Sequence, residues 1–445
     1  MSGLRSMTRL LGLSVLVTSS LMHAQTLEAG VARVEITPPN GLLLEGYPGS
    51  GRTATGVRDP LYARVLVLHV GAQRLALVDV DLIAPFEPAY LAQLRGAVTQ
   101  DVSNLLVTAI HTHSGPALIL GGSSVPPREW ERAAIDKISQ AIHEAATHAV
   151  PVRLGVGYGV AYIGHNRLRT NRDGSVTWFE KNWTGVSTFP TDPTVAVIRV
   201  DDRNGNPIAI LVNYACHPVI FGPDSQLYSA DFPGVMTEVV EKAIGGKALC
   251  FFLQGGDGDI NPLYAVTPLV QGAVELSERT GTELGRVAAR VAQQIQTVAD
   301  PVPSLQVADD TIIFQSRWDA RQWLAADPQN AATIKAKTKA SYELPVMTVL
   351  INKQIALLGM PGEPFVEFQR QWRVRCPVRD CFFLGYVNGY YGYFPTIDAA
   401  TVGGYGAAHP STWIEVGAGE QMLNHALVRV YEMLGRLKPS PEDLQ

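Results

Sequence analysis

The sequence predicts an α/β (mixed α+β) fold built as one large domain. Short apolar runs typical of buried strands alternate with longer segments of helical period, which is the pattern of this class. Hydrophobic residues make up 46% of the chain and charged residues 17%, so there is ample material for a core and no sign of disorder. No repeat or low-complexity linker divides the 445 residues. We therefore expect a single domain over residues 28–437, followed by a tail at 438–445.

Apolar runs rich in Val, Ile and Leu define the expected strands. They lie at 61–70, 74–81, 104–110, 152–156, 194–200, 208–214, 250–253, 305–314 and 346–358. Three segments have a helical apolar stripe instead, at 128–149, 276–298 and 420–437. The Pro- and Gly-rich stretches 38–51, 115–127 and 255–262 interrupt the apolar segments and are expected to be loops, where functional sites usually lie.

The first 24 residues are expected to be an export signal. Arg5 and Arg9 make a positive start, 10–21 is apolar, and Ala24 is a plausible cleavage point, although Met22 fits that site poorly. The apolar stretch is too short for a comfortable membrane span, and no later segment is long and apolar enough. We expect an exported protein, periplasmic or secreted, with no transmembrane segment.

Charge and cysteine content narrow the class further. The net charge is −5 with no basic run, which argues against nucleic acid or an anionic membrane as partner. Cys376 and Cys381 flank a Pro-containing turn and could close a small loop in an oxidising compartment, whereas Cys216 and Cys250 are expected to be buried free thiols. None has the paired spacing of a structural zinc site.

Histidines at two strand ends are the strongest functional signal. His111 and His113 close the strand 104–110, and residues two apart on a strand share a face. His217 follows the strand 208–214 in the same way. Imidazoles brought together at strand ends favour a zinc site. The alternative is that each histidine is only a hydrogen-bonded group at its strand end.

Acidic and aromatic residues on other loops supply further candidates. Glu363 lies on a sharp turn after the strand ending at 358, where it is either a metal ligand or a surface acid. Asp257 and Asp259, in a glycine-rich loop, could bind a cation, orient a histidine or merely form an acidic turn. The tyrosine-rich segment 388–393 could serve packing or chemistry.

Several common hydrolase classes lack their motifs in this chain. There is no Gly-x-Ser-x-Gly elbow and no Walker loop, so serine hydrolases and nucleotide-dependent enzymes lose support. A His-x-His pair also occurs in amidohydrolase barrels. The strand-rich start and the distant Glu363 fit that fold poorly.

Seven short motifs taken together resemble those of the neutral/alkaline non-lysosomal ceramidase family, in its N-terminal catalytic domain. The most specific is His-Thr-His-Ser-Gly-Pro at 111–116. The others lie, in the family's order, at 59–64, 166–167, 213–218, 229–234, 361–363 and 388–393. The resemblance covers nearly all of residues 30–437, and it implies a zinc-dependent hydrolase that cleaves the amide bond of an N-acyl sphingoid base.

The resemblance also implies roles for individual residues. The zinc ligands would be His111, His217, Glu363 and Tyr393. His113 would act as base or proton shuttle. Tyr405 would contact the substrate or the oxyanion, and Arg167 would be a polar contact in the site. Asp231 is either a group that orients a histidine or a turn cap.

Two departures from the family pattern bear on the substrate. The family's Gly-Asp-Val-Ser-Pro-Asn loop contains a serine, and Asn261 stands at that place here. Asparagine cannot form an alkoxide nucleophile, but it can donate a hydrogen bond to an oxyanion. The second departure is length: the family carries a C-terminal β-sandwich domain, which we do not expect after the last predicted helix of this chain. The substrate is therefore expected to be a small-molecule or lipid amide. The alternatives are a zinc hydrolase for another amide or ester, such as an acylated sugar or cell-wall fragment, and a catalytically inactive binding homologue. Oligomeric state is not predicted.

Overall fold

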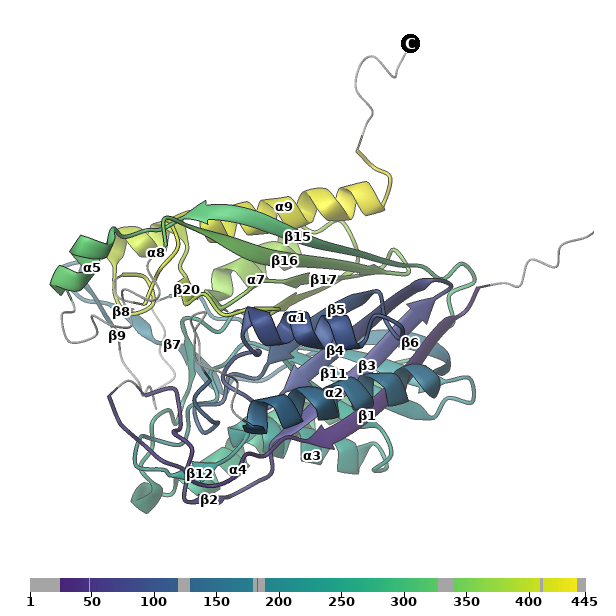
Figure 1. Ribbon diagram of the computed structural model, residues 1–445, viewed down its shortest axis with the longest axis horizontal. Coiled ribbons are helices and arrows are strands. Elements are labelled where there is room, and N and C mark those ends of the chain that lie inside the picture. The colour runs from purple at the N-terminus through teal and green to yellow at the C-terminus, as the bar shows by residue number, and fades with distance from the viewer. Residues whose placement is uncertain are drawn as a thin grey trace, which may run out of the picture.

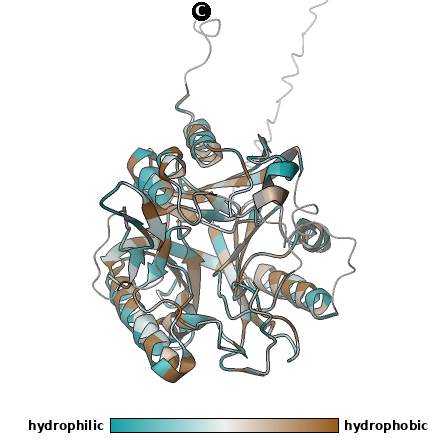
Figure 2. Cartoon of the chain, turned by 90° about the vertical axis from the view of Figure 1, so that its left-hand side faces the viewer, coloured by the Kyte–Doolittle hydropathy of each residue, from teal (hydrophilic) through white to brown (hydrophobic). Residues whose placement is uncertain are grey.

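Two β-sheets packed face to face form the centre of the structure, a computed structural model, and helices cover the outer face of each sheet (Figure 1). The structure describes residues 25–47, 49–118, 129–178, 182, 189–326, 339–408 and 411–437. The expected export signal at 1–24 and the tail at 438–445 thus lie outside the described residues. The end-on view in Figure 2 places the helices at the periphery and the strands between them.

The larger sheet has eight strands and mixed direction. In spatial order they are β13 (Leu249–Gln254), β11 (Pro207–Tyr214), β10 (Thr194–Asp202), β6 (Val150–Val160), β1 (Leu27–Glu35), β3 (Tyr62–Val70), β4 (Gln73–Val80) and β5 (Asn104–Ala109). The pairs β4–β5 and β11–β13 are parallel, and the other pairs are antiparallel. Parallel pairs bring strand carboxyl ends to one edge, which is where ligand sites form in α/β proteins.

The smaller sheet has four strands, β15 (Leu305–Gln315), β16 (Ser341–Ile351), β17 (Ile355–Gly359) and β19 (Asp380–Leu384). The expected single strand at 346–358 was wrong, because β16 and β17 form a hairpin there. Asn352 and Lys353 make the turn with φ of 52° and 54°, the left-handed pair of a type I′ hairpin. Neither residue is a glycine, so the local sequence carried only a weak turn signal.

Helices pack by their apolar stripes on both sides. The larger sheet is covered by α1 (Pro88–Ala97), α2 (Glu129–Thr147), α3 (Asp231–Ala243) and α4 (Ala273–Gln294), and the smaller sheet by α7 (Val366–Arg375) and α9 (Ala418–Met433). The helices expected at 128–149, 276–298 and 420–437 are confirmed as α2, α4 and α9. The sequence pattern does not predict helix α7, because most of its residues are charged or polar. Only Phe368, Trp372 and a few neighbours are buried.

The remaining elements are short. They are β2 (Gly56–Val57), β7 (Gly164–Asn166), β8 (Leu168–Thr170), β9 (Val176–Trp178), β12 (Leu227–Tyr228), β14 (Ile260–Pro262), η1 (Leu269–Gln271), α5 (Ala320–Ala326), β18 (Glu363–Pro364), β20 (Tyr393–Phe394) and α8 (Ile397–Val402). Most of those labelled in Figure 1 gather at its left end, beyond the ends of β5 and β11. Loops and short pairs thus enclose that end of the sheets.

The two edge strands of the larger sheet, β5 and β13, meet across the core. The carboxylate of Asp79 in β4 accepts a hydrogen bond from the backbone of Phe252 in β13 at 3.0 Å. The side chain of Gln254 in β13 donates to the carbonyl of Ile110, just after β5, at 2.9 Å. This closure brings the ends of β5 and β11 together, and with them the residues His111 and His217.

The described residues bear on the expected absence of membrane-spanning helices and on the state of the cysteines. None of the helices described is long and apolar enough to cross a membrane. All four cysteines are buried free thiols. The pair Cys376 and Cys381 is therefore not joined in this structure, while Cys216 and Cys250 are as expected.

Candidate active site

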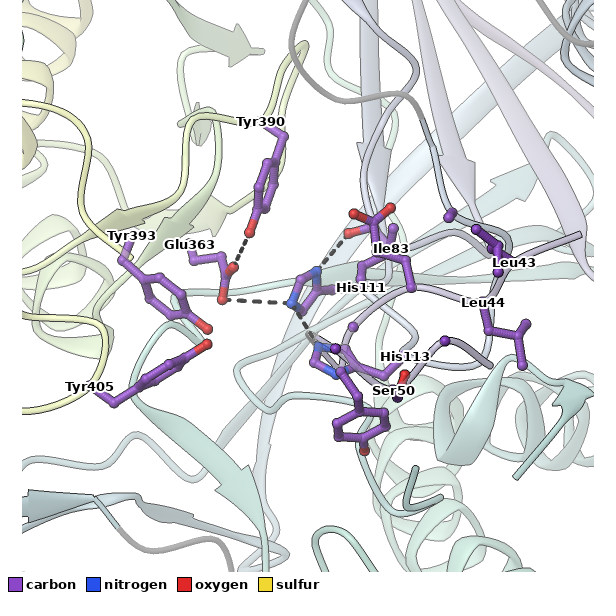
Figure 3. Close-up of a pocket in the computed structure, with 16 residues that line it drawn as sticks. Leu43, Leu44, Ser50, Ile83, His111, His113, Glu363, Tyr390, Tyr393 and Tyr405 are labelled. Carbon is purple, nitrogen blue, oxygen red and sulfur yellow. Dashed lines mark hydrogen bonds and ion pairs between the residues drawn. The ribbon is translucent and has the colours of Figure 1, made fainter. Parts of the chain in front are cut away.

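His111 lies in a turn and not on a strand, because β5 ends at Ala109. Its φ is 71°, a left-handed conformation that is unfavourable for a residue with a side chain. The prediction that His111 and His113 share one face of a strand is therefore wrong, although their two rings do converge. Nε2 of one ring lies 3.2 Å from Nε2 of the other (Figure 3). Nδ1 of His111 donates to the carbonyl of Ile83 at 2.6 Å, which leaves Nε2 facing the cluster.

His217 reaches the same point from the end of β11. Its Nδ1 lies 2.6 Å from the carbonyl of Asp257 and 3.2 Å from the Asp257 carboxylate. One of the sequence-based options for Asp257, orienting a histidine, is thus present in the structure. With Nδ1 engaged in this way, Nε2 of His217 is directed at Glu363.

Glu363 joins the two histidines on the side of the smaller sheet. Its Oε2 lies 3.1 Å from Nε2 of His217 and 3.6 Å from Nε2 of His111. Its other oxygen, Oε1, accepts a hydrogen bond from the hydroxyl of Tyr390 (Figure 3). The residue is 2% exposed, so it is a site carboxylate and not a surface acid.

Donor atoms in this cluster lie close enough together for one metal ion to bind several of them. Two ligands each bound to tetrahedral zinc at ~2.0–2.1 Å lie about 3.3 Å apart, and the contacts among His111, His113, His217 and Glu363 measure 3.1, 3.2 and 3.6 Å. Burial lowers the pKa of His111 to about 3 and the pKa values of His113 and His217 well below their usual range. Neutral imidazole is the form that binds a metal. The three histidines alone also make a group that could hold an ion.

Tyr393, Tyr405, Arg167 and Asn261 lie together beside the cluster. Tyr393 pairs directly with Glu363 across β18 and β20. Its hydroxyl accepts a hydrogen bond from the Arg167 guanidinium at 2.9 Å. Burial raises the pKa of Tyr393 well above its usual range, and Arg167 opposes that rise. Asn261 Oδ1 lies 3.5 Å from the same guanidinium. The Arg167 guanidinium also lies 5.2 Å from the ring centres of both Tyr393 and Tyr405.

Two adjoining cavities open onto these side chains, with volumes of about 380 and 470 Å³. Both are bordered by Tyr47, His113, Tyr393 and Tyr405. The first cavity is also lined by Leu43, Leu44, His111, Glu363 and Tyr390. The second cavity is also lined by Arg167, Trp178, Val219 and Asn261. A substrate can therefore extend in two directions from His113.

Some sequence-based candidates have other roles, and some site residues had been overlooked. Asp231 caps backbone groups, since its carboxylate accepts hydrogen bonds from the backbone of Ile220 and Phe221. Asp259 joins Asn166 to the start of α7. Tyr390 belongs to the tyrosine cluster whose role had been left open. Its spacing of three from Tyr393 gave no sign that it would bond to Glu363.

Comparison with known proteins identifies a related family. A family model described as "Neutral/alkaline non-lysosomal ceramidase, N-terminal" matches residues 27–276. The neutral ceramidases of Mycobacterium tuberculosis and Pseudomonas aeruginosa are each 25% identical, over 245 and 261 residues. These matches cover 49% and 54% of this chain and 37% of each relative. The chain thus spans little more than a third of the length of the curated relatives it matches.

Solved structures extend the similarity to nearly the whole chain at the level of fold. The crystal structure of neutral ceramidase from Pseudomonas aeruginosa superposes with a TM-score of 0.72 and 18% identity, covering 94% of this chain and 76% of that chain. A ceramidase described as complexed with C2 gives a TM-score of 0.70 over 93% of this chain and 76% of the other. Since the family model matches more than half of the sequence, this chain belongs to the neutral/alkaline non-lysosomal ceramidase family.

Proposed function

We propose that the protein is a zinc-dependent hydrolase that cleaves the amide bond of an N-acyl lipid, as ceramidases do. The observation that carries the proposal is the cluster of His111, His217 and Glu363, whose donor atoms converge at separations suited to one ion. The proposed ligands are these three residues and Tyr393. Bound zinc would polarise the scissile carbonyl and acidify water.

His113 would move the proton. Its Nε2 lies at the cluster, 3.2 Å from Nε2 of His111, and burial lowers the pKa of the ring well below its usual range, which keeps the ring neutral. It would take the proton of the attacking water and give it to the leaving nitrogen. The alternative is that His113 is itself a ligand, in a set with His111 and His217.

The wall formed by Arg167, Tyr405 and Asn261 would stabilise the anionic oxygen of the tetrahedral state. Arg167 is buried and supplies a fixed positive charge, and Tyr405 offers a hydroxyl beside it. Preorganised donors in a water-poor site are worth several kcal/mol to such a state, about 2.7–4 for one donor. Asn261 would contribute a hydrogen bond where the family motif has serine, so the reaction would not use that residue as nucleophile.

The substrate would be a lipid amide whose two parts occupy the two cavities beside His113. We also propose that the protein is exported, in keeping with the N-terminal signal expected from the sequence. Another amide or ester remains the alternative substrate, because Asn261 departs from the family motif at the reacting centre.

Metal analysis and a substrate panel together test this function. We expect about one zinc per chain and hydrolysis of N-acyl sphingoid bases, and we expect His217→Ala to lose both. If the protein binds zinc and hydrolyses another acylated compound but not ceramide, the proposed substrate is wrong and the proposed zinc-dependent hydrolysis stands. A wild-type protein that binds no zinc would contradict the proposal.

A further inference from the structure

A single buried carboxamide joins the two chain segments that present His111 and His217. Gln254 is the last residue of β13 and is fully buried. Its Nε2 donates to the carbonyls of Ile110 and Cys216, each at 2.9 Å. Its Oε1 accepts from the N–H of Cys216 at 3.2 Å and from that of residue 255 at 3.1 Å. Ile110 and Cys216 immediately precede the two histidines.

The backbone at His111 needs such support. Its φ of 71° is rare for a residue with a side chain and persists only where the surroundings fix it. The N–H of His111 donates to the carbonyl of Leu82 at 2.9 Å, and Nδ1 donates to Ile83. The bond from Gln254 to the carbonyl of Ile110 holds the peptide between residues 110 and 111 from the opposite side.

We propose that Gln254 is a positioning residue that sets the separation of the His111 and His217 imidazoles and thereby the zinc affinity of the site. The inference rests on the proposed function, in which both histidines are ligands. Gln254 acts through the backbone of the residues before each histidine. Outer residues that orient ligands in this way typically contribute 10- to 100-fold to metal affinity.

Only a carboxamide can make this set of bonds, because the site needs two N–H donors and an acceptor on one group. Gln254→Glu keeps the shape and the acceptor bonds, but an ionised carboxylate has no donor for Ile110 or Cys216. Gln254→Met keeps approximate volume and loses every bond. Gln254→Asn keeps both functions but is one methylene shorter, so it is the mildest of the three changes.

Asn213 provides a matched control. It is a fully buried carboxamide in β11 that donates to the carbonyls of Leu253 and Phe383, both at 2.9 Å. It therefore ties strands together as Gln254 does, but it bonds to no residue adjacent to His111 or His217. Asn213→Asp loses two donors to buried carbonyls, as Gln254→Glu does.

The experiment measures zinc affinity by competition with a chelating indicator, together with kcat, KM and the unfolding temperature. We expect Gln254→Glu to lower zinc affinity about 10- to 100-fold and to reduce kcat more than KM changes. Gln254→Asn should give a smaller loss in the same direction. Asn213→Asp should lower the unfolding temperature but leave zinc affinity within about threefold. Equal zinc affinity in Gln254→Glu and Asn213→Asp would overturn the inference.

If the wild-type protein binds no zinc, the proposed function fails. Crystal structures of the zinc-free wild type and of the mildest Gln254 variant that folds then test whether Gln254 positions the two histidines. The inference predicts that the Nε2 atoms of His111 and His217 shift relative to each other by about 1 Å, enough to disturb a metal site. Unchanged positions would overturn it. If Gln254→Glu does not fold, Gln254→Asn carries the same comparisons.

Discussion

Replacement of Gly46 by alanine should disable His113 without unfolding the protein. Gly46 has a φ of 104° and lies against the base of the His113 side chain. A Cβ placed on Gly46 would be 2.6 Å from Nδ1 and 2.7 Å from Cβ of His113, well inside the 3.4–4 Å of ordinary contact. The ring would therefore have to move by about 1 Å, a displacement that typically costs a catalytic group ~100-fold in rate.

The His113 ring can yield by moving toward the cavities that it borders, which takes it away from its aromatic neighbours. It packs edge-on against Tyr47 and His111, at 5.1 and 4.9 Å between ring centres. The His113 carbonyl accepts a hydrogen bond from Arg52 at 2.8 Å. The strain of Gly46→Ala thus falls on the position of the imidazole, and we expect kcat to fall about 100-fold while zinc content stays near wild type.

Gly41→Ala separates this effect from backbone strain. Gly41 lies on the same loop with a φ of 95°, and no atom lies within 4 Å of the Cβ that would be added. Both variants take on a left-handed alanine, which costs about 1–2 kcal/mol, so both should lose similar stability. Gly41→Ala should keep kcat within about threefold. Wild-type kcat in Gly46→Ala would show that displacing His113 does not slow the reaction, and loss of zinc would place His113 among the ligands.

Other contacts give further predictions. Tyr390→Phe removes the hydroxyl that bonds to Glu363 but keeps the ring, so zinc affinity measured by chelator competition should fall about tenfold; an unchanged affinity would exclude Tyr390 from positioning Glu363. Asn261→Ser should leave zinc bound and change the rate or the substrate range in the acyl-substrate panel, whereas an unchanged profile would mean that Asn261 does not face the reacting group. Gly281→Ala should destabilise the fold by about 1–3 kcal/mol in denaturant titration, because the added Cβ would lie 2.5 Å from the Phe232 carbonyl in α3. Gly96→Ala is on α1, with nothing within 4 Å of its added Cβ, and should instead raise the free energy of unfolding by about 0.4–1 kcal/mol. Equal changes in the free energy of unfolding for Gly281→Ala and Gly96→Ala would contradict the close packing of α3 on α4.

Much of the fold could be predicted because long elements have strong periodicity. The stripe of Ile135, Ile138 and Ile142 specifies α2, and these side chains are fully buried. Elements with weaker local signals were missed or misread. The turn at Asn352 and Lys353 takes its conformation from the pairing of β16 with β17.

The candidate site was found only in part, for a physical reason. Glu363 and the histidines are groups whose chemistry marks them in a sequence, and the structure brings them within 3.6 Å. Gln254 and Tyr390 act through hydrogen bonds to segments more than 25 residues away, which no local pattern encodes. The left-handed His111 was likewise unpredictable, since it is held by contacts from two distant segments, at Leu82–Ile83 and at Gln254.

Anomalous diffraction at the zinc edge from crystals of the zinc-loaded protein would locate the metal ion itself. We expect one strong peak about 2.0–2.2 Å from Nε2 of His111, Nε2 of His217 and an oxygen of Glu363, with the Tyr393 hydroxyl as the fourth protein ligand. A peak held by His113 in place of Glu363 and Tyr393 would contradict the proposed ligand set. No peak at this cluster would contradict the zinc hydrolase itself.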